Sequence, residues 1–198
     1  METPAQNNYP GKIRIIGGRW RHRYIHIPLL PELRPTPNRI RETLFNWLTS
    51  PIHGARCLDL FAGSGALGFE ALSRGAAHVT FVDQSEAVLK VLKQNAERLN
   101  AQHATFLRGK FPNHMPSLPP MRYDIIFLDP PFYQGMIPSA LTWLEQQSSL
   151  KNGSLIYIER ENNLTLLELL GKWTLLKEKK AGHVIYSLWE YEEGMSLK

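Results

Sequence analysis

The chain has 198 residues, of which 43% are hydrophobic, enough to bury one substantial core. It contains no run of 18 apolar residues, and Met1 to Pro10 is polar, so we expect a cytoplasmic protein with no membrane partner. The single cysteine, Cys57, excludes a disulfide framework or a cysteine-based zinc site, and the seven histidines show no metal-ligand spacing, so no metal site is expected.

Positive charge is concentrated near the N-terminus. Between Gly11 and Arg41 there are eight Lys and Arg residues and one Glu, a net charge of 8 − 1 = +7 against +5 for the whole chain. An excess of arginine indicates phosphate recognition, because the planar guanidinium binds phosphate oxygens bidentately. A basic face that serves only solubility is the alternative. The residues expected to contact nucleic acid are Arg14, Arg19, Arg21, Arg34, Arg39 and Arg41.

The first fifty residues predict a small extension. Residues 1–10 are expected to be disordered. Alternating apolar residues in 13–16 and 19–27, on either side of Gly17-Gly18, predict a short basic hairpin. Thr36 as N-cap and Pro37 at the first helical position predict a helix that ends near residue 51, with Arg39 and Arg41 on its exposed side. We therefore expect an RNA-facing extension over 11–51 and the main domain over 52–198.

From residue 55 onward, apolar strands alternate with helices. Strands are expected at 56–60, 78–82, 104–107, 124–128 and 153–159, and helices at 66–73, from Ser85 onward, at 137–147 and at 164–170. Two last strands, at 173–179 and 183–191, are expected to form an antiparallel hairpin. This order predicts an α/β fold with a doubly wound, mostly parallel, seven-stranded sheet, and ligands at the carboxyl ends of its strands.

A glycine-rich turn follows the first of these strands. Gly63, Gly65 and Gly68 fit the pattern G-x-G-x-x-G, in which glycine lets backbone amides approach a ligand closely. The pattern alone also fits nicotinamide and flavin cofactors. Asp59 favours S-adenosylmethionine, because a carboxylate repels a pyrophosphate and attracts the ammonium of a methionine moiety. Alternatively, Asp59 only caps the loop that follows it.

Two further acidic residues end predicted parallel strands, as Asp59 does. Asp83 lies 20 residues after Gly63, a separation at which an acidic side chain can accept both ribose hydroxyls of an adenosine. An exposed turn acid is the alternative for Asp83. Asp129 ends the fourth strand, and three carboxylates in equivalent places indicate a functional edge of the sheet.

Asp129-Pro130-Pro131-Phe132 is the second informative motif. Its two prolines fix an extended loop without amide donors, so its carbonyls can accept hydrogen bonds from an incoming group. The Asp129 side chain and the Pro130 carbonyl could accept both protons of a purine amine while Phe132 stacks on the base. That arrangement restores the nucleophilicity of the amine for in-line attack on a sulfonium methyl group. A motif that merely ends a strand is the alternative.

Together these stretches resemble a known family. Residues 59–68, Asp83 and 129–132 resemble class I S-adenosylmethionine-dependent amino-methyltransferases. Residues 13–21, 34–48 and 182–186 resemble the RsmD family of bacterial 16S ribosomal RNA guanine-N2 methyltransferases, and the resemblance runs from about residue 12 to 189. It implies a Rossmann-like fold, S-adenosylmethionine as cofactor, and one guanine of the small ribosomal subunit as target. We expect a monomer with no obligatory protein partner.

The expected site residues follow from the motifs and the resemblance. Catalysis is expected to involve Asp129, Pro130, Pro131 and Phe132. Cofactor binding is expected to involve Asp59, Phe61, Ala62, Gly63, Ser64, Gly65, Asp83, Gln84 and Gly109. In one departure from the family pattern, residues 107–111 hold no acid for the adenine amine. The contact to the adenine edge is therefore left unassigned, and a backbone group in 109–111 is one candidate for it.

Three other functions remain open at this point. A DNA adenine-N6 methyltransferase would use the same amine geometry, although the chain has no sizeable insertion for a DNA-recognition domain. A non-catalytic RNA-binding assembly factor could share the fold, although the intact Asp129 motif speaks against decay of the site. A nicotinamide oxidoreductase is disfavoured, because no acid or base for hydride transfer is evident beside the glycine turn.

Overall fold

The computed structural model describes residues 11–28, 30, 35–147, 149–161 and 172–193. The predicted disordered tail 1–10, the predicted helix 164–170 and Arg34 lie outside these residues. The strands are β1 (Gly11–Arg14), β2 (Tyr24–Ile27), β3 (Arg56–Asp59), β4 (His78–Asp83), β5 (Ala104–Arg108), β6 (Ile125–Leu128), β7 (Leu155–Glu161), β8 (Trp173–Ala181) and β9 (Val184–Tyr191). The helices are η1 (Gly18–Trp20), α1 (Asn38–Trp47), α2 (Ala66–Ser73), α3 (Glu86–Leu99) and α4 (Met136–Gln146).

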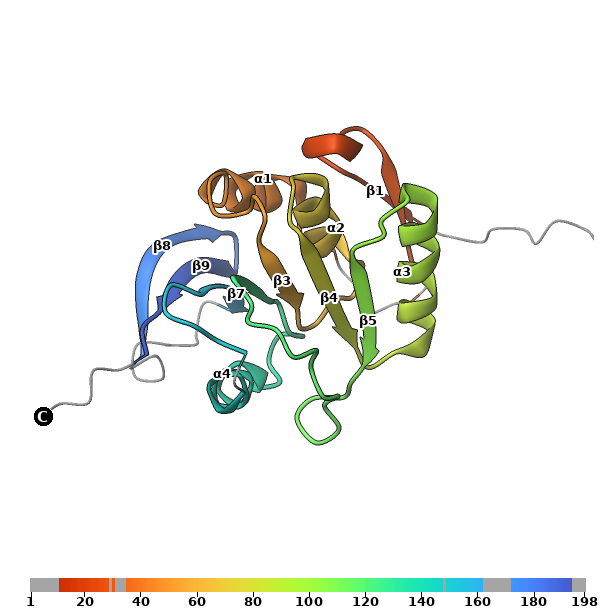
Figure 1. Cartoon of the computed structure of the whole chain (residues 1–198). Helices are drawn as coiled ribbons and strands as arrows, with labels where there is room; N and C mark the ends of the chain where they lie inside the picture. Colours follow the sequence, from red (N-terminus) through yellow and green to blue (C-terminus); the bar gives the residue numbers. More distant parts are fainter. Residues whose placement is uncertain (1–10, 29, 31–34, 148, 162–171, 194–198) are drawn as a thin grey trace, which may run out of the picture.

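A seven-stranded sheet in the order β5-β4-β3-β6-β7-β9-β8 forms the centre of the molecule (Figure 1). The first five strands of this order are parallel, and β9 is antiparallel to both β7 and β8. The chain runs outward from β3 through β4 to β5 and then returns to β6 on the other side of β3. The predicted doubly wound sheet with a C-terminal antiparallel hairpin is confirmed, and the switch point lies between β3 and β6.

Helices cover both faces of the sheet, which explains why the central strand β6 is apolar at every position. Cys57 and Phe127 face the core beneath the N-terminal hairpin, α1, α2 and α3. Leu58 and Leu128 face the other core, which α4 covers. Figure 1 shows α4 on the opposite side of the sheet from α1 and α2.

The N-terminal hairpin packs directly on the main sheet's helices. β1 and β2 pair antiparallel as expected, with Ile13 opposite Ile25, but the turn contains the short helix η1, and the second strand begins only at Tyr24. Gly18 has φ +75 and sits so close to α2 that a Cβ there would lie 1.8 Å from the Ser73 carbonyl oxygen. Trp20 is buried in the shared core at 5% exposure, so it covers the core edge and is not available to stack on bases.

Helix α1 begins differently from the prediction. Its N-cap residue is Pro37, and no side chain caps the helix. The hydroxyl of Thr36 instead donates to Asp129 Oδ2 at 3.2 Å, 93 residues away. The N-cap assignment of Thr36 is therefore wrong, because a buried carboxylate competes successfully for the hydroxyl. The cap of α3 is confirmed, since Ser85 Oγ accepts from Val88 N at 3.3 Å.

Candidate active site

A cavity of about 640 Å³ opens at the carboxyl ends of β3, β4 and β6. It lies at the switch point of the sheet, where open α/β folds bind their ligands. All four expected catalytic residues and eight of the nine expected cofactor residues line it. Sequence reasoning missed several other lining residues, among them Leu30, Thr36, Leu67, Ser85, Val88, Phe111, Met115 and Met136.

The three glycines of the fingerprint have different tasks. Gly63 lines the cavity. Gly65 is the residue absent from the cavity wall: it caps α2 at φ +75 and its N–H donates to the Ala62 carbonyl at 2.7 Å. Gly68 lies within α2, where a Cβ would stand 2.2 Å from the Phe81 ring. Two of the three glycines therefore shape and pack the loop, and a direct contact between Gly65 and the cofactor stays a prediction.

Asp59 supports the start of helix α2 and also borders the cavity. Its Oδ2 accepts from the backbone N–H of Gly68 at 3.1 Å, so the carboxylate holds the first turn of α2. The side chain also lines the cavity. Burial, with smaller contributions from the nearby charges of Asp129 and Asp83, raises the pKa of Asp59 to about 8. A cationic ligand would favour the ionised form of this carboxyl group.

Asp83 fixes the glycine turn from the neighbouring strand. Its Oδ2 accepts from Gly63 N at 2.9 Å and its Oδ1 from Ser85 N at 2.8 Å. Burial raises the pKa of Asp83, and these backbone hydrogen bonds oppose that rise. A carboxylate has about four acceptor sites, so the backbone donors of Gly63, Ser85 and Gln84 leave room for a ligand hydroxyl.

Apolar and aromatic side chains form the wall beyond Asp83. The Phe61 and Phe111 rings meet edge to face with centroids 5.9 Å apart, and Met115 lines the same cavity. Gly109 is buried, its N–H donates to the Asp83 carbonyl at 3.0 Å, and a Cβ there would lie 2.5 Å from Pro116 Cδ. The wall thus suits a flat heterocycle, and the Gly109 amide is already engaged within the protein.

The loop after β6 forms the opposite wall. Asp129, Pro130, Pro131 and Phe132 all line the cavity. Burial raises the pKa of Asp129 to about 6, and the hydrogen bond from Thr36 opposes that rise. The loop ends at Tyr133, which is 74% exposed, has φ +61 and donates its N–H to Glu161 Oε1 at 3.2 Å.

The expected RNA-contacting arginines fall into three groups. Arg14, Arg19, Arg21 and Arg39 are exposed, and the Arg19 guanidinium lies 4.1 Å from the centroid of the Trp20 ring. Arg34 lies outside the described residues. Arg41 is buried at 1% exposure, so the expectation that it lies on the exposed side of α1 is wrong.

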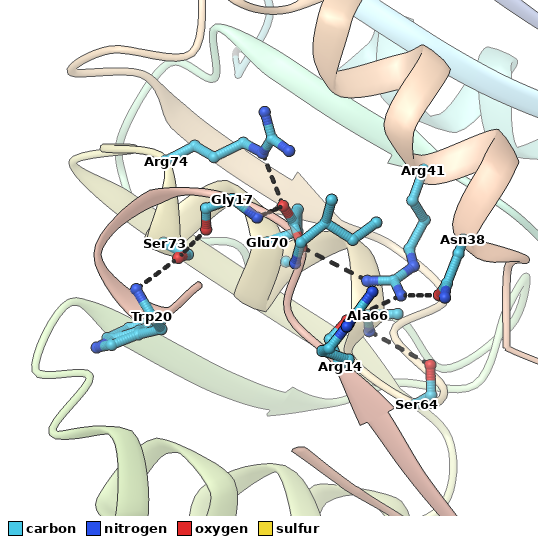
Figure 2. Close-up of polar contacts among 12 residues, drawn as sticks. Arg14, Gly17, Trp20, Asn38, Arg41, Ser64, Ala66, Glu70, Ser73 and Arg74 are labelled. Carbon is cyan, nitrogen blue, oxygen red and sulfur yellow. Dashed lines mark hydrogen bonds and ion pairs between the residues drawn. The ribbon is translucent and has the colours of Figure 1, made fainter. Parts of the chain in front are cut away.

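Arg41 is buried because it joins a polar cluster around Glu70 (Figure 2). Its guanidinium lies 3.5 Å from Glu70 Oε2 and donates to the Arg14 carbonyl at 3.0 Å and to Asn38 Oδ1 at 2.6 Å. Burial lowers the pKa of Arg41, and the Glu70 charge opposes this. Arg41 therefore connects α1 to the hairpin and to α2, with no surface left for RNA.

Within the described part of the chain, no group of three or more His, Cys, Asp or Glu residues could hold a metal ion. No described helix is long and apolar enough to cross a membrane.

Comparison with known proteins agrees with this geometry. Residues 13–190 match a family model described as "Conserved hypothetical protein 95". The chain is 43% identical over 192 residues to "Ribosomal RNA small subunit methyltransferase D" of Escherichia coli, with 97% of this chain and 96% of the relative aligned. It is 42% identical over 200 residues to the protein of that name from Haemophilus influenzae, over 96% and 98% of the two chains.

Solved structures show the same fold. The Escherichia coli protein yhhF superposes with a TM-score of 0.81 at 42% identity, covering 93% of this chain and 100% of that one. A Thermus thermophilus 16S rRNA N2 G1207 methyltransferase, in complex with AdoMet and guanosine, has a TM-score of 0.70 at 22% identity, over 92% of this chain and 50% of that one. On the family model and the long, highly identical relatives, the chain belongs to the RsmD family of S-adenosylmethionine-dependent methyltransferases.

Proposed function

We propose that this chain transfers the methyl group of S-adenosylmethionine to the exocyclic N2 amine of a guanine in 16S ribosomal RNA of the small ribosomal subunit. The observation that carries the proposal is the position of the Asp129–Phe132 loop, which shares one cavity with the glycine turn and Asp83. A purine amine held by the loop would therefore lie beside the bound methyl donor. The names of the relatives supply the ribosomal RNA as substrate class.

The residues of the cavity fit the proposed cofactor. Asp59 offers a buried carboxylate, which suits the ammonium of the methionine moiety, and Asp83 offers acceptors for ribose hydroxyls. Phe61, Phe111 and Met115 offer an apolar surface for the adenine ring. When bound, S-adenosylmethionine supplies an electrophilic methyl group on a positively charged sulfur.

The acceptor loop prepares the amine for attack. In the proposed complex, the Asp129 carboxylate and the Pro130 carbonyl accept the two N–H groups, and Phe132 stacks on the base. Hydrogen bonds directed this way draw the nitrogen lone pair out of conjugation, so the nitrogen can attack in line from roughly 3–3.5 Å. A water-poor cavity favours this step, because positive charge on sulfur disappears as the new bond forms.

The exposed arginines supply a surface for the RNA backbone. Arg14, Arg19, Arg21 and Arg39 lie on the extension, and Thr36, also from the extension, reaches the cavity. We propose that residues 11–51 face the RNA while the remainder binds the cofactor. We further propose that the protein acts as a monomer in the cytoplasm, where its ribosomal substrate is found.

An Asp129→Ala variant tests the proposal. Methyl transfer to small subunits that lack the modification should fall on the order of 100-fold or more, because a positioned acceptor is lost in the transition state. Calorimetry should show S-adenosylmethionine binding within about threefold of wild type, since Asp129 only borders that part of the cavity. Turnover equal to wild type would remove Asp129 from the mechanism, and transfer to duplex DNA in place of RNA would favour the adenine-N6 alternative.

A further inference from the structure

Tyr133 is an exposed aromatic residue beside the cavity, and the mechanism above does not use it. It follows Phe132 directly in the loop between β6 and α4, and Phe132 lines the cavity. At 74% exposure, Tyr133 is the most exposed of the large hydrophobic residues that the structure describes. Single exposed apolar residues are common on protein surfaces and usually carry no function. Tyr133 differs from such residues in its backbone conformation, in the contacts that support it and in its place.

The backbone of Tyr133 has a conformation that tyrosine rarely adopts. Its φ is +61, in the left-handed region, where a bulky residue is an outlier. Among the described residues, the only other non-glycine residues with positive φ are His22 and Asn100, and asparagine tolerates this region well. Strain of this kind persists only where the surrounding structure imposes it, and it is concentrated at functional sites. Glycine or asparagine would relax the loop but would bring no aromatic ring to this place.

Two contacts support Tyr133. Its backbone N–H donates to Glu161 Oε1 at 3.2 Å, so the end of β7 holds the loop. Its ring meets the Phe132 ring edge to face, with a centroid distance of 6.3 Å and an interplanar angle of 81°. The Tyr133 ring is therefore held next to the ring on which the target base is proposed to stack.

Tyr133 also lies where RNA bound to the extension has to pass. Pro35 and Thr36 of the extension line the same cavity as Phe132. These two walls are close together, since the Thr36 hydroxyl donates to Asp129 Oδ2 at 3.2 Å. An RNA strand that contacts the extension and places its guanine in the cavity leaves the neighbouring nucleotides outside the cavity, close to Tyr133.

An aromatic ring in this place has a use in the proposed reaction. A guanine can enter the cavity only by leaving its base stack, which costs the energy of unstacking and leaves the neighbouring base without a partner. An exposed aromatic side chain offsets part of this cost when the neighbouring base stacks on it. Such stacking depends little on sequence, because every base has a π-face. The ring would therefore stabilise the RNA in its opened form.

We propose that Tyr133 contacts the RNA substrate: its ring stacks on the nucleotide next to the target guanine and holds the RNA open while the guanine occupies the cavity. This inference rests on the proposed function and adds to it a contact with a base outside the cavity. The interaction uses the aromatic ring and not the phenolic hydroxyl. Phenylalanine can therefore take the place of Tyr133, and a residue without a ring cannot.

Methyl transfer from labelled S-adenosylmethionine to unmodified small subunits tests the proposal. Tyr133→Asn removes the ring and suits the left-handed backbone. Its kcat/KM should fall by about 5- to 100-fold, chiefly through a higher KM, because the stacking on one base is lost. Tyr133→Phe keeps the ring and should recover the wild-type value. Leu176→Ala is the matched control and should match wild type, because it removes an exposed side chain from β8 at the edge of the sheet.

Thermal unfolding and calorimetry separate the loss of an RNA contact from damage to the loop. In Tyr133→Asn, relief of the backbone strain and loss of the ring contact with Phe132 act in opposite directions, so Tm should change by less than about 3 °C. The Kd for S-adenosylmethionine should stay within about twofold of wild type. A Tm lower by more than about 5 °C, or an equal loss of kcat/KM in Tyr133→Phe, would assign the effect to the loop and refute the proposal.

A photo-crosslink locates the contact directly. The one cysteine of the chain, Cys57, is buried, so Tyr133→Cys introduces a single exposed thiol that can be alkylated with an azidophenacyl group. The labelled protein would be irradiated with small subunits and S-adenosylhomocysteine. The crosslink should lie within about two nucleotides of the guanine that the wild-type protein methylates, located by mass spectrometry of RNA fragments. A crosslink to a distant part of the RNA, or no crosslink, would refute the proposal.

The outcomes separate this inference from the function on which it rests. Normal methyl transfer to guanine by the wild-type protein, with an unchanged KM in Tyr133→Asn, would refute the stacking role and leave the proposed function intact. Absence of transfer to RNA by the wild-type protein would refute the function itself.

Discussion

The interaction around Glu70 that anchors the extension allows a quantitative prediction. Glu70 is fully buried on α2 and receives donors on both oxygens. Its Oε1 accepts from Gly17 N at 2.8 Å and from Arg74 Nε at 2.7 Å. Its Oε2 accepts from Ile16 N at 2.8 Å and lies 3.5 Å from the Arg41 guanidinium (Figure 2).

Replacing Glu70 with glutamine keeps one oxygen and turns the other into an amide NH₂ group. Whichever way the amide is turned, its NH₂ group faces one backbone N–H and one arginine guanidinium. All three groups are donors, so they cannot form hydrogen bonds with one another. The loss of charge also leaves Arg41, which is 1% exposed, without its carboxylate. Breaking a buried pair by removing one partner costs about 3–5 kcal/mol of the free energy of unfolding. For a chain of this length that lowers Tm by roughly 6–20 °C.

Thermal and urea unfolding followed by circular dichroism measure the effect. Glu97→Gln on α3, an exposed carboxylate, is the matched control and should change the free energy of unfolding by less than about 0.5 kcal/mol. The KM for small subunits should rise in Glu70→Gln, because the arginine-bearing hairpin loses its anchor. A change of less than about 1 kcal/mol in Glu70→Gln would show that the cluster does not hold the extension in place.

Three further predictions concern ligand binding. Asp83→Ala should weaken S-adenosylmethionine binding by on the order of 10- to 100-fold in calorimetry, because charged hydrogen-bond acceptors for the glycine turn and the ribose are lost; unchanged affinity would place the adenosine elsewhere. Asp59 has a raised pKa of about 8, and a cationic ligand favours its ionised form. The affinity for S-adenosylmethionine should therefore fall by up to about tenfold for each pH unit below 8, and Asp59→Asn should flatten this pH dependence. Replacing Arg19 and Arg21 with glutamine should reduce the slope of log affinity for RNA against log salt concentration by about 2, and an unreduced slope would move the RNA surface elsewhere.

Local patterns were sufficient to predict the sheet and many of the residues that line the cavity. A parallel strand covered on both faces is apolar throughout, so 124–128 was recognisable as β6, and the residues after it were placed at the cavity. Helix α2 has the predicted bounds, because the glycine turn before it and Gly75 after it, which has φ +101, are both local signals. The aspartates at three strand ends meet because the topology brings the carboxyl ends of parallel strands together.

The sequence-based predictions that are wrong concern residues whose partners lie far away in the chain. The sequence predicts a surface position for Arg41 because a helix pattern reveals only one apolar stripe. In the structure, α1 is also covered on a second side, by the hairpin and by Glu70. The sequence predicts that Thr36 is an N-cap because only local interactions can be read from it, whereas the partner of Thr36 in the structure, Asp129, is 93 residues away.

The identity of the methylated nucleoside tests the account most directly. Purified protein would be incubated with methyl-labelled S-adenosylmethionine and small subunits that lack the modification, and the RNA digested to nucleosides. The account predicts that the label is recovered as N2-methylguanosine in 16S RNA. Label in N6-methyladenosine, or no transfer to RNA by a protein that binds S-adenosylmethionine, would contradict it.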